Sequence, residues 1–347
     1  MYSSPLFLFL ESLWNSQNPF VAFRLPDSKE IMVYFQQNKE LKLTEDWNDS
    51  GFVMAPFQIQ KGLPFIPSTH SKSFLRIQSD GTNPTENKIF PSTEGKEAFI
   101  SLVQKTINEI NKGRFKKVVV SRETTVRVDL SPPTLFLSME QQYAEAMTYL
   151  WHHPQVGTWL GASPEQLLLS KRGTLQSMAL AGTQLYQPKR EVEWKNKERE
   201  EQRLVVEQVL SDLQKYCAKS DIQVSTPFNK QAGNLVHLCT EFRFPQNKIA
   251  LKKWVKALHP TPAIGGIPKT LAQEFITQQE GYDRSFYSGF LGPIEETSAQ
   301  LFVNLRCAQW RPQQLILYIG AGITAKSIPE QEWEETQRKA ETLLRIL

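Results

Sequence analysis

Cysteine is scarce in this chain of 347 residues, which contains only Cys217, Cys239 and Cys307. The three are far apart and none forms a Cys-x-x-Cys pair. A disulfide framework and a cysteine-based zinc site are therefore not expected. A chain without disulfides fits a reducing compartment, so the predicted location is the cytoplasm.

Long apolar runs and an excess of one charge are also missing. No segment approaches the roughly 18 apolar residues of a membrane helix. No Lys or Arg precedes the apolar start of the chain, so a secretory signal is not expected. Lys and Arg number 40 against 36 Asp and Glu, a net charge of +4. The most basic stretch, residues 171–197, is interleaved with or followed by glutamates, which favours a solvated face over a nucleic-acid site. Neither a membrane nor a nucleic acid is a predicted partner.

Several familiar motifs are absent as well. There is no P-loop, no GxGxxG after a strand, no HExxH and no GxSxG, so nucleotide-binding, zinc-protease and α/β-hydrolase functions lose their support. With 40% hydrophobic and 22% charged residues the composition is that of a globular protein. At roughly 150 residues per domain, the length suggests two domains or one large one.

Strands and helices alternate without a regular βαβ rhythm, which predicts an α+β fold with large, mostly antiparallel sheets. Residues 1–95 predict short strands and loops, with a linker or surface loop over 68–94. Helical periodicity is typical of residues 94–112, 134–149, 192–219, 269–278 and 330–347. Strands are expected at residues 31–35, 115–122, 156–160, 166–170, 174–179, 302–308 and 315–320.

The C-terminal helix carries a cluster of charge. At 100° per residue, Glu332, Glu335 and Lys339 share a narrow face beside the apolar stripe of Trp333 and Ala340. Two carboxylates and a lysine on one face are able to hold a cation and an anion together. An ordinary Glu335–Lys339 pair on a solvated face explains the same spacing, and this helix alone favours that interpretation.

A second glutamate pair, Glu198 and Glu201, occupies the helix from residue 192, with Glu198 on its apolar side. Two such pairs are able to hold one hard divalent cation, for which Mg²⁺ is the natural candidate. The alternative is again a charged helix surface, and alone this signal is weak.

Ten short segments, in this order, resemble the chorismate-utilising enzymes, the family of isochorismate, salicylate, anthranilate and aminodeoxychorismate synthases. They are KVVVSR (117–122), GASPEQL (161–167), ALAGT (179–183), EQRLV (201–205), HLCT (237–240), LHPTPAIGG (258–266), YSG (287–289), NLRCA (304–308), GAGI (320–323) and EWEE (332–335). The resemblance implies an α+β chorismate-binding-enzyme fold, with layered antiparallel sheets and flanking helices around a buried cleft. Residues 1–95 would form an N-terminal part without a motif, and residues 96–347 the catalytic region.

The resemblance also implies roles for individual residues. Glu201 and Glu335 would bind Mg²⁺ directly, and Glu198 and Glu332 directly or through water. Lys117 would be the base that activates water, and Glu165 the acid, which requires a raised pKa. Arg306 and Lys339 would anchor a substrate carboxylate. The remaining pocket residues would be Thr183, His237, Ala263, Tyr287, Gly320 and Gly322.

Within this family the chain is most similar to isochorismate synthases. Lys117 is typical of members that attack with water. Ala181 replaces the lysine of the aminodeoxychorismate branch, and Ala263 stands where pyruvate-eliminating members tend to carry Thr. The expected protein is a monomeric, Mg²⁺-dependent isochorismate synthase acting on chorismate, for menaquinone or for a siderophore. Salicylate synthase is the main alternative, and an anthranilate synthase component or a catalytically inactive homologue is less favoured. Gln202, where a His usually follows the metal-binding Glu, departs from the pattern.

Overall fold

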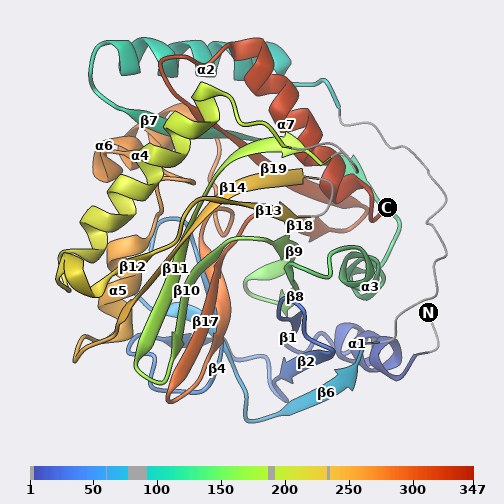
Figure 1. Ribbon diagram of the computed structural model, residues 1–347. Coiled ribbons are helices and arrows are strands. Elements are labelled where there is room, and N and C mark those ends of the chain that lie inside the picture. The colour runs from blue at the N-terminus through green and yellow to red at the C-terminus, as the bar shows by residue number, and fades with distance from the viewer. Residues whose placement is uncertain (1–3, 60, 77–91, 187–191, 233–234) are drawn as a thin grey trace.

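The computed structural model describes residues 4–59, 61–76, 92–186, 192–232 and 235–347 (Figure 1). The strands of this part form two large sheets, and the strand pairs within them are antiparallel. The first, sheet A, has nine strands, in spatial order β15 (Gly266–Ile267), β7 (Lys117–Arg127), β19 (Gln314–Ile323), β18 (Cys307–Arg311), β9 (Gly157–Ser163), β8 (Met147–His153), β1 (Phe20–Arg24), β2 (Glu30–Phe35) and β6 (Ser71–Leu75).

Sheet B has ten strands, nine of them along its main path. They are β12 (Gln223–Val224), β14 (Leu235–Pro245), β11 (Thr174–Leu185), β10 (Gln166–Lys171), β17 (Ser298–Val303), β16 (Phe290–Ile294), β4 (Gly51–Ala55), β5 (Leu63–Pro67) and β3 (Lys42–Thr44), with β13 (Phe228–Ala232) paired to β14. Strands from residues before 96 complete the far side of both sheets, so this part of the chain is integral to the fold.

The two sheets pack face to face around an aromatic core. Strand β1 begins with four apolar residues in a row and does not alternate apolar with polar residues. Successive side chains of a strand point to opposite faces of the sheet, and here both faces are covered. Val21 and Phe23 enter the core between the sheets with Trp151 and Trp159. Phe20 and Ala22 face the other way, into a core shared with helices. The result is a four-layer arrangement of helices, sheet, sheet and helices.

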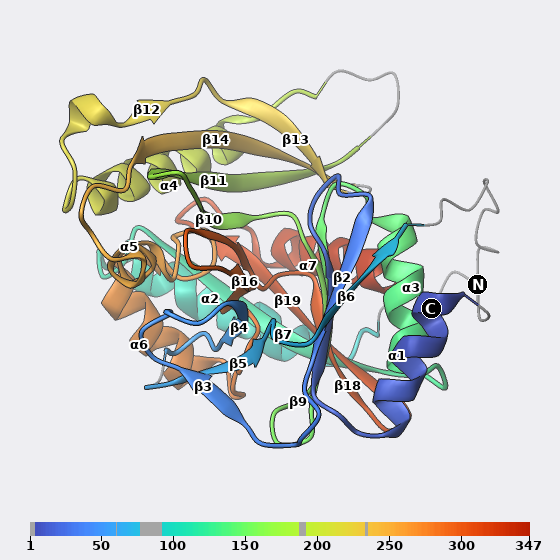
Figure 2. The ribbon, with the colours of Figure 1, turned by 90° about the horizontal axis from the view of Figure 1, so that it is seen from below.

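Helices cover the two outer faces, as Figures 1 and 2 show. Against sheet A lie α1 (Pro5–Asn15), α2 (Lys96–Asn111), α3 (Pro132–Gln142), α6 (Lys269–Gln279) and α7 (Pro329–Leu344). Against sheet B lie α4 (Asn196–Leu213) and α5 (Leu251–Leu258). Helix α7 packs on β19 of sheet A and α4 on β11 of sheet B. The two glutamate helices are in contact, because Lys197 of α4 pairs with Glu332 of α7. None of the described helices is long and apolar enough to cross a bilayer.

The predicted fold class and layered sheets are confirmed, but some elements were wrongly predicted. Helix α1 lies where strands and loops were expected, and it begins with Ser4 capping the amide of Phe7 and with Pro5 in its first turn. The helix expected over 134–149 ends at Gln142, and β8 takes up the apolar run from Met147. Part of the linker expected over 68–94 is strand β6, and its residues 77–91 lie outside the described residues.

The strand expected over residues 302–308 is also wrong, because the chain leaves sheet B after β17 and enters sheet A at β18. The helix expected over 192–219 is shorter, and α4 spans Asn196–Leu213. Helices expected at 94–112, 269–278 and 330–347 are confirmed as α2, α6 and α7 within a few residues.

Candidate active site

One cavity collects most of the predicted site residues. Its walls come from β7, β11, β14, β19, α4, α7 and the loops after α5 and around Tyr287. The predicted residues that line it are Glu165, Thr183, Glu201, His237, Ala263, Tyr287, Arg306, Gly320, Gly322, Glu335 and Lys339. The other three predicted residues, Lys117, Glu198 and Glu332, do not line the cavity.

Lys117 begins β7 and is fully buried. Its Nζ lies 2.9 Å from Oε1 of Glu201, which reaches across from α4. This contact depends on Gly322 of β19. A Cβ at position 322 would lie 2.5 Å from the Glu201 oxygen and 3.1 Å from Cε of Lys117. The predicted glycine therefore leaves room for an ion pair between the predicted base and a predicted metal ligand.

Glu165 occupies the connection between β9 and β10, where the chain passes from sheet A to sheet B. The residue is 2% exposed. Burial raises the pKa of its carboxyl group to about 7, against the opposing effects of a hydrogen bond from Thr261 and the charge of Lys117. Thr261 Oγ1 donates that bond to Oε1 over 3.2 Å. A carboxyl group with this pKa retains its proton in part at neutral pH, as the predicted acid requires.

The buried His237 and the half-buried Arg306 form a pair on the cavity wall. Nη2 of Arg306 lies 2.6 Å from Nε2 of His237, and because a guanidinium only donates, Nε2 must accept. The proton of the neutral ring is then on Nδ1, which lies 3.0 Å from the carbonyl oxygen of Gly182. Burial and the charge of Arg306 lower the pKa of His237 well below its usual value. His237 therefore acts as a neutral support that orients Arg306.

The backbone also directs Arg306 into the cavity. Its φ is +48°, in the left-handed region that non-glycine residues rarely occupy. The reversal lies between β17 and β18, where the buried Asn304 accepts a hydrogen bond from Tyr149 and donates one to the carbonyl of Phe286. Strain of this kind is held by the surrounding structure and is frequent at functional sites.

The two predicted metal-binding glutamates of α7, Glu332 and Glu335, are each paired with a lysine. Oε1 of Glu335 lies 2.8 Å from Nζ of Lys339, which also donates to the carbonyl of Gly320 over 3.0 Å. Glu332 is almost fully buried and pairs at 2.5 Å with Lys197 of α4. Burial and the neighbouring Glu335 raise the pKa of Glu332. Burial acts in the same direction on Glu335, but the charge of Lys339 outweighs it and the pKa of Glu335 is lowered.

The glutamates of the two helices fit a hard divalent cation by their chemistry. Among the described residues, no three acidic, His or Cys side chains converge closely enough to form a metal centre as they stand. The candidate donors are all carboxylate oxygens, which Mg²⁺ prefers. Glu201 and Glu335 line the same cavity. In addition, Oε2 of Glu198 is buried without a hydrogen-bond partner in the described structure, which leaves it available to a ligand.

Comparison with known proteins gives the family. A model of the family described as "Chorismate binding enzyme" matches residues 66–347, which include every predicted site residue. The chain belongs to the chorismate-binding enzymes. The resemblance first stated from short motifs is thereby confirmed.

Relatives of this chorismate-binding enzyme include several isochorismate synthases. The isochorismate synthase MenF of Haemophilus influenzae is 27% identical over 289 residues, covering 80% of this chain and 67% of that protein. The vibriobactin-specific isochorismate synthase of Vibrio cholerae is 30% identical over 310 residues, covering 81% and 77%. A solved structure of a Bacillus anthracis protein described as a 2,3-dihydroxybenzoate-specific isochorismate synthase, DhbC, has a TM-score of 0.82 at 25% identity and covers 97% and 98%.

In this chorismate-binding enzyme the structure adds residues that the sequence did not single out. Thr261 bonds Glu165 and lies inside the segment LHPTPAIGG, so its place in that segment was the available signal. Lys197 pairs with Glu332 and immediately precedes Glu198. The pair Glu280 and Arg284, discussed below, carried only the weak signal of opposite charges four residues apart.

Proposed function

We propose that the protein is an isochorismate synthase that converts chorismate to isochorismate with Mg²⁺. The observation that carries the proposal is the burial of Glu165, whose pKa burial raises to about 7, in one cavity with Glu201, Arg306 and Lys339, while the buried Lys117 pairs with Glu201 of that cavity. A base, an acid and two cationic anchors suit the exchange of one hydroxyl for another on a dianionic ring. Relatives that carry the name isochorismate synthase support the same function.

The proposed reaction adds water at C2 and loses the hydroxyl at C4. Lys117, when neutral, takes a proton from water as the oxygen bonds to C2. The ring double bonds shift, the C4–O bond breaks, and Glu165 gives its proton to the departing hydroxyl, which leaves as water. Lys117 ends protonated and Glu165 ionised, and exchange with solvent restores both. The hydroxyl exchange is redox-neutral, so it needs no oxidant or reductant.

Other residues of the chain hold the substrate during this exchange. Arg306, kept in place by His237, offers a planar pair of donors suited to a carboxylate, and Lys339 adds a second positive charge. Glu198, Glu201, Glu332 and Glu335 would hold Mg²⁺, which when bound would neutralise the ring carboxylate of the substrate. Glu201 is also the ion-pair partner of Lys117, so this carboxylate connects the proposed base with the proposed metal site.

Isotopic labelling tests this chemistry. In water enriched in ¹⁸O, isochorismate formed by the protein should carry one ¹⁸O, at C2, after a single turnover. Mass spectrometry of the isolated product reads the label. Isochorismate without label would mean that the C4 hydroxyl migrates within the ring, and would contradict the roles given to Lys117 and Glu165.

Salicylate synthase is the second candidate function, and Ala263 is the residue that disfavours it. Ala263 lines the cavity in the turn that also carries Thr261. Its methyl group offers no hydrogen bond to a substrate oxygen, whereas pyruvate elimination needs the enolpyruvyl group held over the C2 hydrogen. We therefore expect the wild-type protein to release little pyruvate.

Replacing Ala263 by threonine is expected to raise pyruvate release and to lower the yield of isochorismate. The β-branched hydroxyl side chain of threonine would restrict the pose of the substrate's enolpyruvyl group. Pyruvate is measured by coupling to lactate dehydrogenase, and salicylate by fluorescence. Ala250→Thr, at an exposed position before α5, is the matched control and should leave the product ratio unchanged. An unchanged ratio in Ala263→Thr would remove Ala263 as the determinant of product choice.

A further inference from the structure

Strand β7 loses its neighbour on one edge close to the predicted base. β15 pairs with β7 only at Gly266 with Val118 and Ile267 with Lys117, and the amide of Val119 then reaches the carbonyl of Gly265 over 2.7 Å. Beyond this point the loop that precedes β15 turns away. The carbonyl of Val119 and the amide of Ser121 are left on an edge that no strand of the described part of the chain covers. Buried main-chain groups of this kind need other partners.

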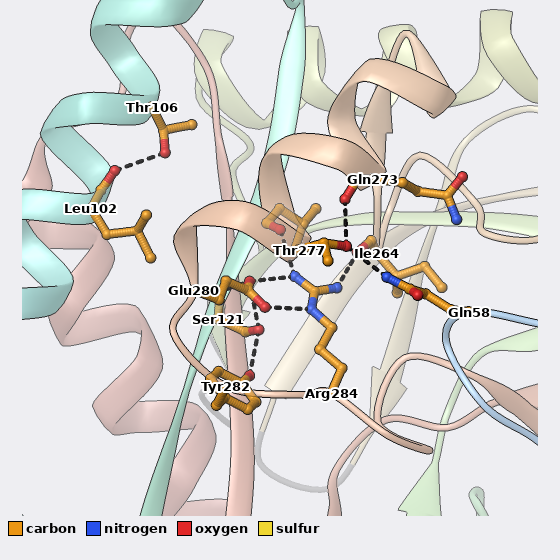
Figure 3. Close-up of polar contacts among 11 residues, drawn as sticks. Gln58, Leu102, Thr106, Ser121, Ile264, Gln273, Thr277, Glu280, Tyr282 and Arg284 are labelled. Carbon is orange, nitrogen blue, oxygen red and sulfur yellow. Dashed lines mark hydrogen bonds and ion pairs between the residues drawn. The ribbon is translucent and has the colours of Figure 1, made fainter.

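A buried ion pair takes the place of the missing strand (Figure 3). Nη2 of Arg284 donates to the carbonyl of Val119 over 2.8 Å. Oε1 of Glu280 accepts from the amide of Ser121 over 2.7 Å and from its hydroxyl over 2.8 Å. Arg284 and Glu280 bond each other twice, at 2.8 Å and 2.6 Å, and their side chains are 2% and 1% exposed. A buried ion pair adds little net stability over an apolar pair, which favours a positioning role for Arg284 and Glu280.

Arg284 also holds the loop that turns away. Its Nη1 donates to the carbonyl of Ile264 over 2.9 Å. The amides of Ile264 and Gly265 both donate to the carbonyl of Thr261, which closes a tight turn. Thr261 in turn donates its hydroxyl to Glu165. A continuous set of hydrogen bonds therefore runs from Arg284 through this turn to the proposed acid.

We propose that Arg284, held by Glu280, is a positioning residue that fixes the turn of residues 261–265 against β7, so that Thr261 orients the carboxyl group of Glu165 toward the reacting hydroxyl. One arginine thus sets the spacing between β7, which carries Lys117, and the turn that holds Glu165. This inference rests on the function proposed above, because it takes Glu165 as the acid.

The expected direction of the effect follows from the hydrogen bond. Thr261 donates to the carboxylate, so its bond stabilises the ionised form and keeps the pKa of Glu165 lower than burial alone would. The charged or titratable groups that act on Glu165 from neighbouring elements are Lys117 of β7, Lys230 of β13 and the Cys239 thiol of β14. A variant that releases Thr261 leaves all three in place. Its Glu165 should titrate at higher pH than in the wild type.

The test compares Arg284→Lys with Thr261→Val in protein labelled with ¹³C at the glutamate carboxyl groups. The Glu165 resonance is assigned by its absence in Glu165→Gln, and its titration is followed by NMR without substrate. Both variants should move the Glu165 titration to higher pH, and the double variant should move it no further than Thr261→Val alone. In the isochorismate assay, Arg284→Lys should lower kcat at least tenfold with a smaller change in KM.

Arg24→Lys is the matched control, because Arg24 is equally buried and its Nε lies 2.9 Å from Glu140, away from the cavity. It should leave both the titration and kcat unchanged. Glu280→Gln, which loosens Arg284 but keeps an acceptor for Ser121, replaces Arg284→Lys if the latter does not fold. An unshifted Glu165 titration in the folded variant would overturn the positioning role. A wild-type protein that forms no isochorismate would instead overturn the proposed function, since the titration needs no substrate.

Discussion

Glu165→Gln is expected to lower the rate of isochorismate formation at least about 100-fold, the usual contribution of a general acid. Glutamine keeps the acceptor oxygen that Thr261 bonds but has no proton to give to the C4 hydroxyl. The measurement is the initial rate of isochorismate formation at saturating chorismate and Mg²⁺. Glu123→Gln, an exposed glutamate on β7, is the control and should retain full activity.

The same variant has a stability signature that separates lost chemistry from lost folding. Burial raises the pKa of Glu165 to about 7, above the roughly 4.3 of an unfolded chain, so the folded state binds this proton more tightly. The free energy of unfolding that the folded protein loses by ionising the Glu165 carboxyl group grows as the pH rises from about 4 to 7. Glutamine removes that loss. The melting temperature of Glu165→Gln should exceed that of the wild type at pH 8, by clearly more than it does at pH 5.

Lys117→Met is expected to be comparably inactive, because methionine fills the buried site without a group that can accept a proton. The ion pair with Glu201 is lost with it. Circular dichroism checks the fold, and product chromatography measures the activity. Turnover near the wild-type rate in a folded Lys117→Met protein would overturn the assignment of Lys117 as the base.

Metal removal is also expected to have a very large effect. An excess of chelator should abolish turnover, and added Mg²⁺ should restore it, because four glutamates from two helices supply the donors that this cation prefers. Glu201→Ala and Glu335→Ala should each remove most of the activity, and calorimetry should show weakened Mg²⁺ binding in both. Both residues line the cavity from opposite helices.

Glu334→Ala is the control for the metal experiment, since Glu334 adjoins Glu335 on α7 but is exposed. It should bind Mg²⁺ and turn over as the wild type does. Because Glu201 also partners Lys117, Glu201→Gln is included to keep the volume of the side chain. Full activity in excess chelator would exclude the metal from the mechanism.

The parts of the site that rest on local periodicity were predictable from the sequence. The face of α7 that carries Glu332 and Glu335 follows from 3.6 residues per turn, and the structure places Trp333 and Ala340 in the core beside it as expected. Gly322 was predicted as a pocket residue from the family resemblance, and its lack of a side chain leaves room for Glu201. The short motifs, taken together, identified the family.

Features that depend on distant parts of the chain were not predictable in this way. An apolar run such as Met147–His153 suits a helix or a buried strand equally, and pairing with β1 and β9 decides for the strand. The strand expected over 302–308 fails because tertiary packing forces the reversal at Arg306. The Arg284–Glu280 pair has meaning only next to the edge of β7, more than 150 residues earlier in the chain.

The central claim is tested most directly by incubating the purified protein with chorismate and Mg²⁺ and separating all products by chromatography over time. The account predicts that isochorismate accumulates to a fixed ratio with chorismate, and that the same ratio is reached when the reaction starts from isochorismate. Neither salicylate nor stoichiometric pyruvate should form, and added ammonia should give no anthranilate. Stoichiometric pyruvate with salicylate, anthranilate in the presence of ammonia, or unchanged chorismate would contradict the account.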